Sequence, residues 1–354
     1  MQRKSRFKSL YLILLCITAI LFLFSGCAKD KNVEVNETKE VPDFVALNEV
    51  VPGRPNIYLI VKVLDNNYWN VIVKGVADAG LDMDCNVYYS GSVVETDWEI
   101  QQQLLQNAVD AGADGIVFAP DDSIRLSESV SQVYNSGIPI VLIDTVVNTT
   151  DYGICYMTDN LIAGQTAAKE MLEQLHKRGT SEDEEVFIAI QVGSPSSQTI
   201  SERLAGFCSY WTKNAPEKWQ IIDEVKSNEG DIDKAVECAN SFFDTYKQID
   251  GVFGSNNGST VGFARAVKER GRNDVVVIGF DYSAEMADLI KDENYYAATM
   301  LQRQYDMGYL GVKSVLDCID GVPLSCKFQD TGVVVVNSDT LSDEDVQQII
   351  KYNE

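Results

Sequence analysis

The chain is poor in the residues on which most catalytic and metal sites depend. It contains one histidine in 354 residues, His176, and imidazole is the commonest general base and metal ligand near neutral pH. The sequence also lacks a Gly-x-Gly-x-x-Gly motif and a phosphate loop ending in Gly-Lys-Ser/Thr, the two common signatures of nucleotide sites. These absences favour a protein that is not an enzyme and uses no cofactor or metal. His176 itself is expected in the last turn of a helix, where a cation suits the dipole.

Positive charge is also scarce. The chain has 29 Lys and Arg against 53 Asp and Glu, a net charge of −24. Four of the basic residues lie within the first eight positions, and without them 25 basic residues face 53 acidic ones, a net charge of −28. Such a charge repels nucleic acid and argues against an anionic ligand. It also favours solubility outside the cell.

The N-terminus has the pattern of an export signal. A basic start is followed by an apolar run over residues 10–24, which is shorter than the roughly 20 residues of a spanning helix. The run ends in Leu23-Phe24-Ser25-Gly26-Cys27, which resembles a bacterial lipoprotein box. That resemblance implies a signal peptide over 1–26 and a lipid on Cys27, although Phe24 stands where the family usually has Leu. An uncleaved membrane anchor is the alternative.

Residues 27–55 are polar and are interrupted by Pro42, Pro52 and Pro55. They are predicted to form a flexible tether that holds the folded part away from the membrane. The chain from residue 56 onward is long enough for two domains, each with its own core.

The cysteines give no metal site. The sequence has eight, of which Cys16 leaves with the signal and Cys27 takes the lipid. No pair among the remaining six has the spacing of a zinc knuckle. Cys318 and Cys326 flank a Gly-Val-Pro turn and can meet as a disulfide outside the cell, whereas a buried free thiol is the alternative for each. The six are Cys85, Cys155, Cys208, Cys238, Cys318 and Cys326.

Beyond residue 55, short apolar runs alternate with longer segments of helical spacing. The runs predict buried parallel strands, the segments predict helices, and their alternation predicts an α/β fold with doubly wound sheets. Gly112, Gly137, Gly179 and Gly271 fall where left-handed helix caps are expected. The predicted strands are 57–63, 115–119, 139–143, 186–191, 251–253, 275–279 and 333–336, and the predicted helices are 68–80, 98–111, 124–135, 161–177, 198–213, 232–246, 261–270 and 307–319.

Ligands of open α/β sheets bind at the carboxyl ends of the strands, and here those ends are followed by aromatic, carboxylate and amide residues and one arginine. Aromatic rings can cover the C–H faces of a sugar. Carboxylates, amides and a guanidinium can bond its hydroxyls, each charged bond contributing roughly 1.5–3 kcal/mol. The residues are Asn66, Tyr68, Trp69, Asp144, Arg203, Asn256, Phe280, Asp281 and Gln302.

The segment 57–69, with its Asn66, Tyr68 and Trp69, resembles the opening of periplasmic sugar-binding proteins of the ribose-binding type. Further motifs continue the resemblance in the same order: Asp159-Asn160, Arg203-Leu-Ala-Gly-Phe207, Asn256, Gly279-Phe280-Asp281 and Ala298-Thr-Met-Leu-Gln302. The resemblance implies the type I periplasmic-binding-protein fold, two Rossmann-like lobes joined by a three-crossing hinge that closes on the ligand. It places lobe one at 56–158 plus 303–331 and lobe two at 159–302 plus 332–354. It also implies that the nine residues named above contact sugar.

Two positions depart from the ribose type. Ribose binders have Ser at the position of Lys62 and Arg at that of Thr145. If Lys62 points inward, the positive charge therefore lies on a different side of the binding site than in ribose binders. We count Lys62 as a tenth site residue. A Lys here also resembles receptors for the furanosyl signal autoinducer-2, in which an Asp matches Asp121. Those receptors lack counterparts of Arg203 and Asp281, so a sugar is favoured.

Each site residue also has a purely structural alternative. Lys62 can lie in solvent at the mouth of the site, and Phe280 can be core. Asp144 and Asp281 can cap the turns after their strands. Tyr68 and Trp69 can pack a helix onto the sheet, and Arg203 can pair with Glu202.

The sequence thus predicts a monomeric, extracytoplasmic solute-binding lipoprotein. It would deliver a monosaccharide or similar sugar to the permease subunits of an ABC importer. The alternative is a sensory receptor, for a sugar or an autoinducer-2-like signal, that is coupled to a membrane kinase.

Overall fold

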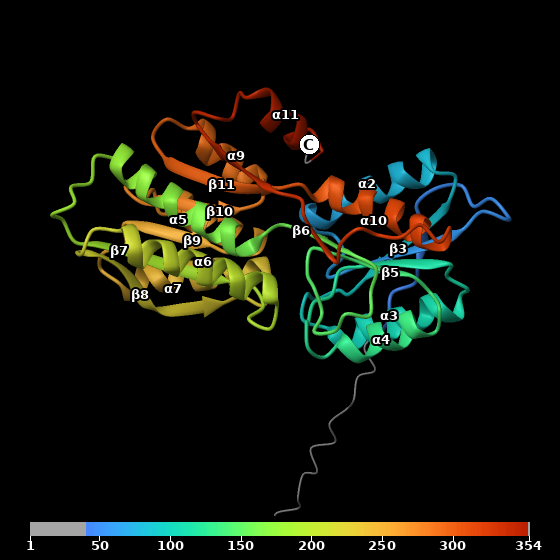
Figure 1. Ribbon diagram of the computed structural model, residues 1–354. Helices are drawn as coiled ribbons and strands as arrows, with labels where there is room; N and C mark the ends of the chain where they lie inside the picture. Colours follow the sequence, from blue (N-terminus) through green and yellow to red (C-terminus); the bar gives the residue numbers. More distant parts are fainter. Residues whose placement is uncertain (1–39, 353–354) are drawn as a thin grey trace, which may run out of the picture. The chain divides into compact units, whose positions relative to one another are not determined.

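The structure is a computed structural model, which describes residues 40–352. The predicted signal peptide and Cys27 lie outside the described residues. From Val41 onward the chain forms two α/β lobes (Figure 1). Within the described range, no helix has the length and apolar character needed to cross a membrane.

The first lobe is built on a seven-stranded sheet of order β1-β3-β2-β4-β5-β6-β12, parallel except where β1 joins β3. Alternate side chains of β2 face opposite sides. Ile57 and Leu59 pack against α2 and α10, whereas Tyr58 and Ile60 pack against α3 and α4 (Figure 1). The strands are β1 (Val45–Ala46), β2 (Asn56–Val61), β3 (Asn86–Gly91), β4 (Gly115–Phe118), β5 (Ile140–Ile143), β6 (Cys155–Met157) and β12 (Phe328–Asp330), and the helices are α2 (Asn67–Asp82), α3 (Trp98–Asp110), α4 (Ser127–Asn135) and α10 (Gln304–Ile319).

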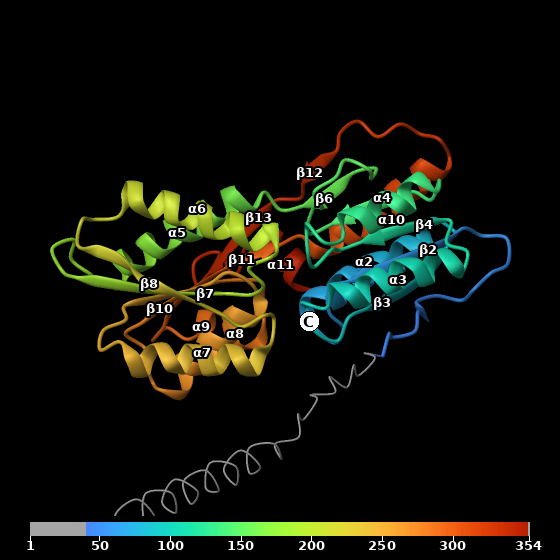
Figure 2. The same cartoon turned by 90° about the horizontal axis from the view of Figure 1, so that it is seen from below.

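The second lobe has a six-stranded sheet of order β13-β11-β10-β9-β7-β8, in which only the β13–β11 pair is antiparallel. Helices α5 and α6 cover one face, and α7, α8, α9 and α11 contribute to the core on the other (Figure 2). The strands are β7 (Val186–Val192), β8 (Trp219–Ser227), β9 (Gly251–Gly254), β10 (Val276–Phe280), β11 (Tyr296–Gln302) and β13 (Val333–Asn337), and the helices are α5 (Asn160–Lys177), α6 (Gln198–Asn214), α7 (Ile232–Thr245), α8 (Asn257–Glu269), α9 (Ala284–Lys291) and α11 (Glu344–Ile350).

The chain passes between the lobes three times, after β6, after β11 and after β12. Side-chain hydrogen bonds join these crossings. The Asp159 backbone N–H donates to Asp330 Oδ1 at 2.9 Å, and Thr158 Oγ1 donates to Gln302 Oε1 at 3.0 Å. The predicted class, α/β with two doubly wound lobes, is confirmed.

The predicted tether differs from the structure in its second half. Residues 41–55 lie against the first lobe, where Val45 pairs with Tyr89 in the sheet and Phe44 packs edge-to-face on Tyr58 with ring centroids 4.8 Å apart. Asn48 Nδ2 also donates to the Cys85 carbonyl at 2.8 Å. An edge strand is held mainly by backbone hydrogen bonds, which any residue except proline can make. A polar stretch can therefore be ordered although its side chains show no apolar pattern.

Of the other predictions from local sequence patterns, some are confirmed and some elements were not predicted. All four predicted helix-end glycines are left-handed, with φ between +62° and +97°, and His176 lies in the last turn of α5 as expected. Strand β8 and helices α9 and α11 were not predicted, and the three-residue strands β6 and β12 are too short for a periodic pattern.

The six cysteines of the folded part are all free thiols. The disulfide considered between Cys318 and Cys326 is absent, and Cys326 is exposed. Cys85 and Cys155 are buried, so the alternative of a buried free thiol holds for them.

Candidate functional site

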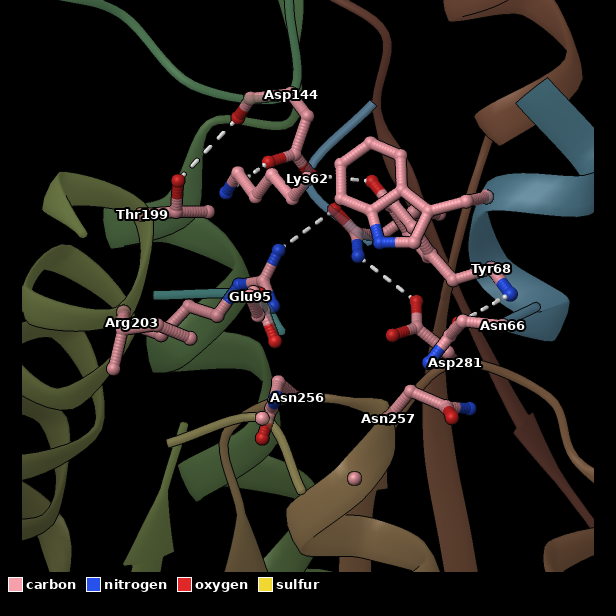
Figure 3. Close-up of a pocket in the computed structure, with 15 residues that line it drawn as sticks. Lys62, Asn66, Tyr68, Glu95, Asp144, Thr199, Arg203, Asn256, Asn257 and Asp281 are labelled. Atoms are coloured by element: carbon pink, nitrogen blue, oxygen red, sulfur yellow. Dashed lines mark hydrogen bonds and ion pairs between the residues drawn. The ribbon is translucent and has the colours of Figure 1, made fainter. Parts of the chain in front are cut away.

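Side chains from both lobes line one cleft (Figure 3), whose empty space, counted together with the open solvent at its mouth, is about 420 Å³. It lies where the carboxyl ends of the two sheets face each other, because its residues follow strands β2, β3, β5, β7, β8, β9 and β10 or end strand β11. Nine of the ten predicted residues line it: Lys62, Asn66, Tyr68, Trp69, Asp144, Arg203, Asn256, Asp281 and Gln302.

The wall from the first lobe is organised around Asp144. Lys62 Nζ lies 2.7 Å from its Oδ2, and the Tyr68 hydroxyl donates to its Oδ1 at 2.5 Å. Burial alone would raise the pKa of Asp144, but the charges of Lys62 and Arg203 and these hydrogen bonds hold the pKa below its ordinary value. Only 3% of Lys62 is exposed. Lys62 therefore points inward, and its alternative placement in solvent is wrong.

The wall from the second lobe is organised around Arg203, which is 2% exposed. Its Nε donates to Asn160 Oδ1 at 2.7 Å, its Nη1 to the Ser255 carbonyl at 2.9 Å and its Nη2 to Gln302 Oε1 at 2.8 Å. Since a guanidinium has five N–H groups, two remain for a ligand. The suggested pairing with Glu202 is wrong, because that carboxylate accepts from Gln198 instead.

Asp281 follows β10 as Asp144 follows β5. Its Oδ1 accepts from Gln302 Nε2 at 2.9 Å and from Gln304 Nε2 at 3.5 Å. Burial, opposed by Arg203 and Gln302, raises its pKa to about 6. Neither aspartate caps a turn with its carboxylate, so that alternative is wrong for both. Among the described residues, Asp281 Oδ2 has no hydrogen-bond donor, which leaves it for a ligand.

Asn66 and Asn256 are helix N-caps that also line the cleft. Asn66 Oδ1 accepts from the Tyr68 backbone N–H at 2.9 Å, and Asn256 Oδ1 accepts from the Ser259 backbone N–H at 3.2 Å. Capping uses only the oxygen of each amide, so the Nδ2 groups remain as donors. The structural and binding roles of these two residues are therefore compatible.

Of the predicted aromatic residues, Trp69 and Tyr68 line the cleft and Phe280 does not. Phe280 is fully buried in the core of the second lobe, with the Arg203 guanidinium 4.1 Å from its ring centre. A cation over an aromatic face is attracted by the ring. Phe280 therefore packs against the guanidinium from within the core and does not line the cleft. The alternative of a core role holds for this residue.

Several residues that line the cleft were not predicted from the sequence: Glu95, Thr199, Ile200, Gly230, Asn257 and Gly258. Glu95 lies four residues after the end of β3, a strand whose carboxyl end was not among those considered for ligand contacts. Burial, partly offset by Lys62 and reinforced by Asp144, raises its pKa. Its carboxylate faces Gly230 across the cleft, where a Cβ atom would lie 2.3 Å from Oε2.

Asp121, considered as a counterpart of an autoinducer-2 contact, does not line the cleft. It is 2% exposed, and both carboxyl oxygens are buried without a hydrogen-bond partner. Burial raises its pKa to about 8, against the attraction of Lys62.

Comparison with known proteins agrees with this geometry. The model of the periplasmic binding protein domain family matches residues 57–322. The D-allose-binding periplasmic protein of Escherichia coli (strain K12) is 25% identical over 269 residues, covering 73% of this chain and 83% of that protein. The ribose import binding protein of Bacillus subtilis (strain 168) is 24% identical over 265 residues, covering 75% and 82%.

Two solved structures are similar throughout their length. A carbohydrate transporter solute-binding protein from Agrobacterium radiobacter in complex with D-arabinose has a TM-score of 0.80 and 26% identity, covering 85% of this chain and all of that one. An ABC transporter solute-binding protein from Agrobacterium vitis with bound D-fucose has a TM-score of 0.76 and 29% identity, covering 83% and 99%.

Proposed function

Because the chain belongs to the periplasmic binding protein domain family, we propose that it is the extracytoplasmic solute-binding protein of an ABC importer. Its ligand is a monosaccharide, held between the lobes and released to permease subunits. The similar proteins are named for allose and ribose, and the similar structures hold arabinose and fucose. These names refer to binding and transport and do not favour the sensory alternative. We further propose that the protein acts as a monomer and catalyses no reaction.

The observation that carries the proposal is the convergence of unused hydrogen-bonding groups from both lobes on one cleft. Asp281 Oδ2 and the Glu95 carboxylate accept, whereas Arg203 and the amides of Asn66 and Asn256 donate. A sugar hydroxyl is both donor and acceptor, so it can satisfy either kind of group.

An apolar surface adjoins these polar groups. Trp69 and Tyr68 form one side of the cleft, with ring centroids 4.8 Å apart and their planes at 81°. Such rings pack against the C–H face of a pyranose or furanose while the polar groups bond its rim. A sugar that occupies the cleft would displace water from these groups, and each charged hydrogen bond would then strengthen.

Lys62 and Thr145, the two departures from the ribose type, contact each other. Lys62 Nζ donates to Thr145 Oγ1 at 2.8 Å and also pairs with Asp144. Lys62, which follows β2, thus supplies Asp144 with a buried positive charge, whereas in ribose binders an Arg follows the matching Asp directly. Asp144 accepts from Lys62, Tyr68 and Thr145, which leaves it little capacity for ligand. We infer that Asp144 mainly positions its neighbours and that sugar specificity differs from that of ribose binders.

We also propose that Cys27 carries a lipid and that a short tether precedes the folded part. The support is the sequence pattern of residues 3–27. Since residues 41–55 belong to the first lobe, the tether ends near residue 40. Metabolic labelling with a fatty acid should mark the wild-type chain and not Cys27→Ala. Equal labelling of both would contradict a lipid on this residue.

A thermal-shift screen of the chain starting at Ala28 tests the binding function. Pentoses, hexoses, polyols and autoinducer-2 are offered separately. A ligand at 100 times its dissociation constant should add about 2.7 kcal/mol to the free energy of unfolding. At least one monosaccharide should do so. Stabilisation by another class of compound, with none by any monosaccharide, would overturn the proposal.

A further inference from the structure

A short hydrogen bond between two threonine hydroxyls crosses the cleft. Thr145 follows β5 in the first lobe, and Thr199 lies in the first turn of α6 in the second. Their Oγ1 atoms are 2.5 Å apart, and the residues are 0% and 2% exposed. Figure 3 shows Thr199 directed at the loop of Asp144, whose carbonyl lies 3.4 Å from Thr199 Oγ1.

The neighbours of Thr145 fix the direction of this bond. Thr145 Oγ1 lies 2.8 Å from Lys62 Nζ and 2.8 Å from Asp144 Oδ2. An ammonium group can only donate, and an ionised carboxylate can only accept. The single hydroxyl hydrogen of Thr145 therefore goes to Asp144, and Thr199 must donate to Thr145. Thr199 is thereby joined to the buried ion pair of Lys62 and Asp144.

This bond joins two side chains of the protein directly. Thr199 lines the cleft, whereas Thr145 does not, so the protein itself closes this end of the site. A bond between the lobes exists only while they are closed together. It therefore stabilises the closed arrangement relative to any open one, by an amount that the charged partners of Thr145 increase.

We propose that Thr145 and Thr199 form a clasp that stabilises the closed state of the cleft before ligand binds. Resting on the proposed function, Thr199 is a positioning residue that raises affinity for the sugar without being its main contact. The physical basis is that apparent affinity scales with the fraction of molecules already in the binding-competent state.

Two variants of Thr199 distinguish the effect of its hydroxyl group from the effect of its side-chain shape. Thr199→Val keeps the volume and removes the hydroxyl, whereas Thr199→Ser keeps the hydroxyl. Without ligand, small-angle scattering should give a larger radius of gyration for the Val variant than for wild type, and no change for Ser. Thr212→Val is the matched control, because Thr212 is exposed on the same helix and bonds only the Cys208 carbonyl.

The clasp also predicts an effect on affinity. With the sugar identified by the thermal-shift screen, Thr199→Val should weaken binding about 5- to 10-fold, the effect of one good hydrogen bond. The loss should appear in the equilibrium dissociation constant, because the bond exists only in the closed state. In a double-mutant cycle, Thr145→Val and Thr199→Val should be non-additive by a similar factor.

The proposal fails if Thr199→Val and Thr199→Ser give the same radius of gyration and the same affinity, or if the two valine substitutions are additive. A thermal melt of each variant checks that it folds. The scattering comparison needs no ligand, so it judges the clasp even if no sugar binds. In that case the proposed function fails separately.

Discussion

Asp144 and Asp281 hold the same position in the two lobes but have opposite pKa shifts. Each directly follows a strand in the left-handed region, with φ of +64° and +69°, a conformation that Asp tolerates better than most residues. The pKa of Asp144 is lowered because Lys62 and Arg203 outweigh burial, whereas the pKa of Asp281, bonded to amides, is raised to about 6. One is therefore a fixed anion and the other can be protonated.

This difference predicts how pH affects stability. Asp281 holds its proton more tightly when folded, so its contribution is full below its ordinary pKa of 3.8 and is lost as pH rises through about 6. Asp144 acts in the opposite sense, since its contribution is lost as pH falls through its lowered pKa. Denaturant melts from pH 4 to 7 should show a smaller decline with pH for Asp281→Asn than for wild type. An unchanged profile would contradict the raised pKa.

Ionisation of Asp121 should lower the free energy of unfolding at higher pH, and by more than that of Asp281. Its folded pKa of about 8 lies above the ordinary 3.8, so stability should fall as pH rises across this range, with a limiting slope of about 1.4 kcal/mol per pH unit. Asp121→Asn keeps the shape, removes the charge and should be more stable than wild type at pH 8. The exposed Asp320→Asn is the control. A variant that is less stable than wild type at pH 8 would show that the carboxylate has an ionic partner.

Lys62 should matter for folding as well as for binding. It is the near cation of Asp144, and removing one partner of a buried ion pair costs about 3–5 kcal/mol. Lys62→Met should therefore lower the free energy of unfolding by several kcal/mol. The double variant with Asp144→Asn should recover part of that loss, because no uncompensated charge remains. Urea denaturation of the set measures both. If Lys62→Met were as stable as wild type, the ion pair of Lys62 and Asp144 would not contribute to the stability of the fold.

Trp69 should be essential for binding. Trp69→Ala removes the larger of the two aromatic side chains that line the cleft. It should weaken sugar binding at least about ten-fold, since burying a large apolar side chain contributes roughly 1.5–3 kcal/mol. Titration calorimetry measures this, and circular dichroism checks the fold. Trp98→Ala is a control outside the cleft. Equal affinities for the two variants would exclude Trp69 from the site.

Arg203→Lys tests the hydrogen bonds of the second lobe. An ammonium cannot reproduce the three directed bonds to Asn160, Ser255 and Gln302. The substitution should cost about 1.5–3 kcal/mol for each charged bond that is lost, with binding reduced at least ten-fold. Arg265→Lys is a suitable control, since Arg265 forms a partly exposed pair with Glu285. Wild-type affinity in Arg203→Lys would show that the guanidinium geometry is unimportant.

Much of the site followed from the sequence because of one geometric rule. Parallel strands in a sheet end at the same edge, so residues that follow them meet in space even when they are far apart in the chain. Asn66, Asp144, Asn256 and Asp281 were found in this way, without any contact being known. Glu95 was missed because the carboxyl end of its strand, β3, was not included when the rule was applied.

The sequence by itself determined the alternation of strands and helices, the turn glycines and the identity of most cleft residues, because these depend on local periodicity and strand order. Tertiary structure decided which groups are already satisfied. It buried Phe280 beneath Arg203, directed Lys62 inward to Asp144 and joined Thr145 to Thr199 across the cleft. It also ordered residues 41–55 against the first lobe. Hydrogen-bond partners are fixed by distances between lobes and between sheet edges, and no pattern along a single chain specifies those distances.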